Sequence, residues 1–141
     1  MLISTTLFLY ANLSAYNLAA CIMEDLTLFK AWTLTTSPAQ LQQMQSVTGV
    51  PVAWIYLITK TAMTVMTPFL VSEEPRLWWC IAAMAVSWGS SFLVQIPLQL
   101  KVRETGDRAA MKRLARTTKV RTWSMIVHAA VVGWVVWGTM Q

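Results

Sequence analysis

Four stretches of about 20 predominantly apolar residues take up most of this 141-residue chain. A helix of roughly 20 apolar residues crosses a hydrocarbon core about 30 Å thick, so each stretch is long enough to span a membrane. Only 12% of the residues are charged and 56% are hydrophobic, which leaves too little polar surface for a soluble domain. The chain is therefore expected to be an all-α integral membrane protein.

The apolar stretches predict four spans in a single transmembrane domain, 1–141: residues 2–23, 51–71, 77–100 and 123–140. The helix of the first span either ends near Met23 or continues toward Trp32, and the sequence leaves both alternatives open. The link between the second and third spans, 72–76, is so short that these two helices must be antiparallel neighbours. A four-transmembrane-helix bundle follows from this arrangement.

A short amphipathic interfacial helix is predicted between spans 1 and 2. Ser37 followed by Pro38 has the form of an N-cap and a first helical residue. Apolar residues then recur at helical spacing up to Val47, and the glutamines between them are expected to face water: Gln40, Gln42, Gln43 and Gln45.

The basic residues are concentrated in one predicted loop, 101–122. Eight of the eleven Lys and Arg residues lie there: Lys101, Arg103, Arg108, Lys112, Arg113, Arg116, Lys119 and Arg121. Loops rich in Lys and Arg stay on the cytoplasmic side. The sequence therefore predicts a cytoplasmic basic loop, both chain termini outside, and the Glu73-Glu74 turn outside.

The basic loop has a second interpretation as a nucleic-acid or lipid-binding element, because Asp107 can cap a helix from Arg108 to about Arg116. Membrane topology alone requires such a loop, and contact with anionic headgroups follows without a dedicated function. The topological interpretation is favoured, and no nucleic-acid partner is expected.

One charge stands inside the second span. Lys60 lies nine residues past Pro51, at a depth where a charge costs several kcal/mol unless the protein pairs or solvates it. Three more polar groups are predicted at similar depth, namely Glu24, Gln95 and His128. We expect these four residues to form an intramembrane cluster in which Glu24, ahead of Asp25, pairs with Lys60. Such a cluster either ties the helices together or forms a functional site.

Most tryptophans occur near predicted span ends, as amphipathic rings at headgroup depth do. Trp88 instead lies in the middle of the third span, either as lipid-facing bulk, the favoured interpretation, or as the wall of an internal pocket. The cysteines, Cys21 and Cys80, lie at opposite ends of their spans and lack metal-type spacing, so no metal site is expected. The sequence specifies no cofactor.

The C-terminal half carries a resemblance. This half contains the sequence SFLVQIPLQ at residues 91–99, followed by a basic segment. The sequence RTTKVRT at residues 116–122 then leads into the final span. Over 85–137 this arrangement resembles small bacterial four-span membrane proteins of the anthrone-oxygenase-like kind. The resemblance implies a bacterial inner membrane location, with Pro97 and Arg121 as family-like positions at the inner membrane face. Some fungal relatives are implicated in cofactor-independent oxidation of polycyclic anthrones, which implies a hydrophobic substrate held between helices.

Two functions fit the sequence. The favoured one is a non-catalytic accessory subunit, in contact with the lipid bilayer and with other membrane subunits or copies of itself, because the chain supplies much membrane surface and few catalytic groups. The alternative is a protein that binds a hydrophobic small molecule inside the bundle, or an oxygenase-like enzyme, in which Lys60, Glu24 and His128 orient a carbonyl or phenol.

Overall fold

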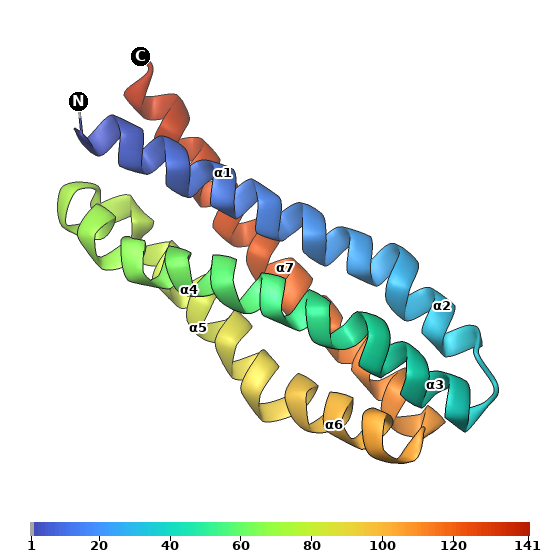
Figure 1. The fold of residues 1–141 in the computed structure, drawn as a ribbon. Coiled ribbons are helices and arrows are strands. Elements are labelled where there is room, and N and C mark those ends of the chain that lie inside the picture. The colour runs from blue at the N-terminus through green and yellow to red at the C-terminus, as the bar shows by residue number, and fades with distance from the viewer. Residues whose placement is uncertain (1) are drawn as a thin grey trace.

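The computed structural model describes the backbone of residues 2–141 and the side chains of residues 5–141. Within these residues four long helical segments run alternately up and down and pack into one bundle (Figure 1). Each is long and apolar enough to cross a membrane, which confirms the predicted all-α four-helix bundle. Spans 1 to 4 are Thr5–Leu34, Pro38–Glu73, Pro75–Thr105 and Arg108–Thr139.

A π-helical turn, in which hydrogen bonds reach one residue further than in an α-helix, interrupts spans 1, 2 and 3. In chain order the elements are α1 (Leu2–Met23), a π-turn (Glu24–Leu28), α2 (Phe29–Leu34), α3 (Pro38–Met44), a π-turn (Gln45–Gly49), α4 (Val50–Glu73), a 3₁₀ turn (Pro75–Leu77), α5 (Trp78–Ser90), a π-turn (Ser91–Gln95), α6 (Ile96–Thr105) and α7 (Arg108–Thr139).

The spans are longer than a hydrocarbon core requires. They contain 30 to 36 residues, which corresponds to about 45 Å or more at 1.5 Å per residue, against a core of about 30 Å. The surplus lies mainly at the end of the bundle that holds the turns 35–37 and 106–107, which we call the basic end. Both chain termini lie at the opposite, terminal end (Figure 1).

The helix predicted from Pro38 is present and has the predicted cap, since the Ser37 Oγ accepts from the Gln40 N–H at 3.4 Å. It does not form a separate interfacial helix, because α3 continues through the π-turn into α4 as one segment. Pro51 falls in the first turn of α4, where a missing N–H is tolerated. Gln45, expected to face water, is buried.

The predicted basic loop, 101–122, is almost entirely helical. Span 3 continues to Thr105 and α7 begins at Arg108, which leaves only a two-residue turn. Met111 and Leu114 are buried against the rest of the bundle, so this segment has a buried apolar face among its basic residues and is not the loop that the sequence predicted. The predicted Asp107 cap is confirmed, and the helix that it starts runs on without a break into span 4.

The turn between α6 and α7 depends on two residues. Gly106 has a left-handed backbone with φ +64°, and its N–H donates to the Val102 carbonyl at 2.8 Å. The Asp107 carboxylate accepts from the N–H groups of Ala109 and Ala110 at 2.8 and 3.1 Å. The ion pair with Lys101 and these backbone bonds hold the pKa of Asp107 below its usual range.

Substitution of Gly106 by alanine is expected to destabilise the bundle. The left-handed conformation alone costs a non-glycine residue about 1–3 kcal/mol, and the added Cβ would stand 2.4 Å from the Pro38 carbonyl oxygen. The measurement is thermal unfolding in detergent. Gly133→Ala is the matched control, because a Cβ there meets no neighbouring atom within 4 Å. Equal stability of the two variants would contradict the packing of the two turns.

Two apolar cores fill the bundle. The larger one lies toward the terminal end and includes Leu7, Met63, Leu77, Met125 and Val135. The smaller one lies at the basic end: Phe29, Trp32, Leu41, Val102, Ala110, Met111 and Leu114. Five buried polar residues lie near the boundary between the two cores, and we call them the polar layer: Glu24, Gln45, Lys60, Gln95 and Arg121.

Candidate intramembrane binding site

The centre of the polar layer is an ion pair between spans 1 and 4. Arg121 Nη2 donates to Glu24 Oε2, and the two side chains are only 7% and 6% exposed. Arg121 Nη1 also donates to Gln95 Oε1 of span 3 at 3.3 Å. The guanidinium carbon lies 4.5 Å from the ring centre of Tyr56 in span 2. Each of the four spans therefore supplies one group to this contact.

The expected pairing of Glu24 with Lys60 is wrong, because Arg121 takes the carboxylate. A guanidinium is planar and offers several donors in a fixed geometry, which suits a buried carboxylate better than an ammonium does. The position of Arg121 in the sequence did not indicate that it pairs with Glu24. Arg121 lies two residues before Trp123 and was expected at the membrane face, whereas its side chain is buried within the bundle.

Lys60 has unusual surroundings for a buried cation. It is 4% exposed, and its Nζ lies 4.3 Å from the ring centre of Trp88. Its hydrogen bond goes to the Ser91 hydroxyl at 3.4 Å. Among the side chains of residues 5–141, no carboxylate forms an ion pair with it. The ammonium therefore has an aromatic ring and one hydroxyl in place of a counter-ion.

Trp88 forms part of a pocket wall beside Lys60, and its ring is only partly buried, so the pocket-wall interpretation applies without excluding a lipid-facing surface. Its indole Nε1 donates to Thr64 Oγ1 at 3.0 Å, which fixes the ring beside Lys60. Phe92 stacks on the ring with a centre-to-centre distance of 5.2 Å. The π-turn Ser91–Gln95 contains Phe92 and supplies both the Ser91 hydroxyl and the Gln95 amide.

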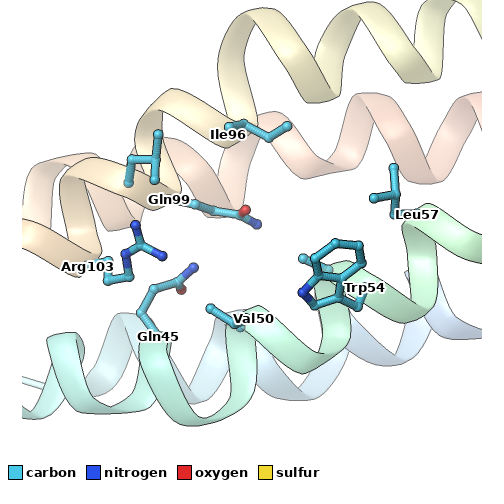
Figure 2. Close-up of a pocket in the computed structure, with 10 residues that line it drawn as sticks. Gln45, Val50, Trp54, Leu57, Ile96, Gln99 and Arg103 are labelled. Carbon is cyan, nitrogen blue, oxygen red and sulfur yellow. The ribbon is translucent and has the colours of Figure 1, made fainter.

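A crevice between spans 2 and 3 opens next to these groups. Its deep part has a volume of about 80 Å³ and contains Lys60, Trp88, Gln95 and Arg121 in its walls. A wider part of about 230 Å³ continues between α4 and α6 to Gln45 and Arg103 at the basic end (Figure 2). The two parts share four lining residues, so we treat them as one crevice: Ala53, Leu57, Ile96 and Gln99.

Two polar atoms of the polar layer have no hydrogen-bond partner within the described part of the chain. They are Arg121 Nε and Gln45 Oε1. A buried polar atom without a partner costs about 1–3 kcal/mol, so unpaired atoms that gather around one crevice point to a polar ligand or water. Lys60 and Arg121 against Glu24 leave one surplus positive charge there, which favours an anionic group.

His128, predicted in the same cluster, belongs to a separate network. It lies seven residues after Arg121 in α7, about 10 Å along the helix axis. Its ring is fully buried, with Nε2 2.8 Å from Tyr10 OH and Nδ1 2.8 Å from Ser14 Oγ. Tyr10 OH is also 2.8 Å from Thr67 Oγ1. We call these four residues the histidine network.

The proton positions in the histidine network follow from its last member. Thr67 donates its hydroxyl proton to the Met63 carbonyl at 2.7 Å, so its oxygen accepts from Tyr10. Tyr10 then accepts from His128 Nε2–H, and His128 Nδ1 accepts from the Ser14 hydroxyl. Every side-chain group is satisfied with a neutral imidazole, so this network stabilises the helix packing and needs no ligand.

Of the other predicted positions, Gln95 lies in the crevice and Pro97 does not. Pro97 is exposed and occupies the first turn of α6 directly after a π-turn, where its missing N–H is tolerated. Cys21 and Cys80 are buried free thiols. Tyr56 and Ser91 were missed as site residues, and the signal that could have found them is their spacing of four residues from Lys60 and Gln95.

Comparison of the chain with protein-family models, with characterised proteins and with solved structures gives no match. The resemblance of residues 85–137 to anthrone-oxygenase-like proteins therefore stays a prediction.

Proposed function

We propose that this four-span membrane protein binds an amphiphile with an anionic head, such as a carboxylate or phenolate, in the crevice between spans 2 and 3. The observation that carries the proposal is the Lys60 ammonium, buried beside the crevice without a counter-ion. The head would lie in the deep part against Lys60, Gln95 and Arg121. The apolar body would lie along Leu57 and Ile96.

The cost of burying the Lys60 charge exceeds what its contacts in the protein return, which supports a role in binding an anion. A charged lysine at depth costs about 2.5–3.5 kcal/mol, and a desolvated cation–π contact returns about 2 kcal/mol. The single hydroxyl contact at 3.4 Å is long and adds little. Stability therefore gives no reason for a lysine here, whereas an anion in the crevice would satisfy the free N–H donors.

The size and walls of the crevice indicate the kind of ligand. A volume of about 80 Å³ holds two or three waters at about 30 Å³ each, or a head group of similar size. Trp54 and Ile96 line the wider part and are 59% and 39% exposed on the outer surface. A hydrophobic tail can therefore leave the crevice sideways into the bilayer. In this proposal the basic end faces the cytoplasm, because the basic residues concentrate there.

The accessory-subunit role is the competing proposal. The apolar outer surfaces support it, in particular a groove of about 510 Å³ between α5 and α7, lined by Trp79 and Trp123. That role requires no buried cation, so it predicts that Lys60 is dispensable for assembly. An oxygenase-like activity would use the same crevice. Binding of a ligand there is required both for a binding protein and for an oxygenase-like enzyme.

Binding of oleate tests the proposal, with the protein in nanodiscs of zwitterionic lipid. We expect saturable binding that Lys60→Met weakens roughly 10- to 100-fold, because a charge-assisted contact contributes about 1.5–3 kcal/mol. Oleyl alcohol, which has the same tail and no charge, should bind weakly to both proteins. Lys60→Met should fold at least as stably as the wild type, since it removes an uncompensated charge.

Arg113→Met is the matched control for the loss of one positive charge. Arg113 is exposed and lines neither part of the crevice, so this variant should bind oleate as the wild type does. Equal affinity of the wild type and Lys60→Met for oleate would refute the proposed site.

A further inference from the structure

We propose a second site, independent of the crevice, at which the head group of an anionic phospholipid binds between spans 1 and 4. A cavity of about 260 Å³ lies there, between the basic-end part of span 1 and α7. Four cations line it: Lys30, Lys112, Arg116 and Lys119.

The charge of this pocket is unbalanced. None of the four cations forms an ion pair with a described carboxylate. Asp25 also lines the pocket, and its Oδ2 accepts a hydrogen bond from the Thr122 hydroxyl. With one carboxylate against four cations, the pocket has a net charge of +3. A phosphate group matches this arrangement, because basic pockets between membrane helices at a charged interface bind anionic lipid heads.

The pocket lies at the depth of a lipid head group. Lys119 precedes Trp123, the first residue of the apolar part of α7, by four residues, about 6 Å along the axis. On span 1, Asp25 comes two residues after Met23, the last of the apolar residues 2–23. The cations therefore stand where the apolar surface ends, which is the level of lipid phosphates in a bilayer.

An apolar groove leads away from the same pocket. Lys119 also lines the groove between α5 and α7, whose other walls include Trp79, Val86, Trp123 and Val127. This groove runs from Lys119 toward the terminal end, along the direction that an acyl chain takes in the bilayer. A basic pocket that continues into an apolar groove fits a phospholipid better than a free phosphate, which would use the pocket alone.

Retention of lipid by the full chain in detergent tests this site. The protein is mixed with equal amounts of phosphatidylglycerol and phosphatidylcholine with identical acyl chains, and bound lipid is counted by native mass spectrometry. We expect preferential retention of phosphatidylglycerol. The variant Lys112→Gln/Lys119→Gln should lower its affinity about 30-fold, the effect of two cations near an anionic head group.

The control variant is Arg108→Gln/Arg113→Gln, which removes the same charge from exposed positions outside the pocket. It should retain phosphatidylglycerol as the wild type does. An equal loss in both variants would overturn the site in favour of diffuse charge attraction. Displacement of the lipid by millimolar glycerol phosphate would also overturn it, because the pocket would then recognise a free phosphate without the acyl chains.

Discussion

Replacing Glu24 with alanine is expected to lower the free energy of unfolding by about 3–5 kcal/mol, the cost of breaking a buried ion pair. Arg121 would remain 6% exposed and charged, with Gln95 and the Tyr56 ring as its remaining contacts. Thermal unfolding in detergent measures the loss. Glu73→Ala is the matched control, since Glu73 is an exposed carboxylate at a helix end and should matter little.

A double-mutant cycle identifies the partner of Glu24. Glu24→Ala combined with Arg121→Leu should cost less than the sum of the single changes, because neither charge is then left alone. Glu24→Ala combined with Lys60→Met should be close to additive. Coupling of Glu24 to Lys60 in place of Arg121 would contradict the geometry of the polar layer.

Replacing His128 with leucine is expected to destabilise the bundle by about 2–6 kcal/mol. The change keeps an apolar side chain in the core but leaves two buried hydroxyls, Ser14 and Tyr10, without one partner each, at about 1–3 kcal/mol per group. Thermal unfolding again measures the loss. Ligand binding in the crevice should survive the change, because the histidine network lies about 10 Å from Arg121 along α7.

The assigned proton positions provide an independent check on the histidine network. Nitrogen NMR shifts of His128 should report a neutral ring with its proton on Nε2. A ring with its proton on Nδ1 would mean that the Thr67 hydroxyl donates elsewhere, contrary to its bond with the Met63 carbonyl.

Much of the fold was predictable from local patterns. The four apolar stretches identify the spans, and the caps at Ser37 and Asp107 follow from short side chains that can accept backbone N–H groups. The sequence did not indicate that the helices continue past the predicted ends of the spans. The π-turn Gln45–Gly49 lets span 2 continue through Pro51, which the sequence predicts as the start of a span, and the buried face of α7 extends the last span beyond its apolar part.

The candidate site was predictable in part. Glu24, Lys60 and Gln95 were identified by polarity alone, since a polar residue within an apolar span needs an internal partner. The partners depend on how each helix is rotated. A π-turn adds one residue, which rotates the following segment by about 100°, and three such turns precede or contain site residues. The pairing of Glu24 with Arg121 and the ring over Lys60 follow from that geometry and not from spacing.

The most direct test of the proposed function is native mass spectrometry of the protein extracted gently from its own membranes. We expect an acidic hydrophobic molecule bound to the wild type and to Arg113→Met but lost from Lys60→Met, with all three proteins equally folded. A wild-type protein without such a molecule, held in a larger complex that Lys60→Met joins equally well, would contradict the account and support the accessory-subunit role.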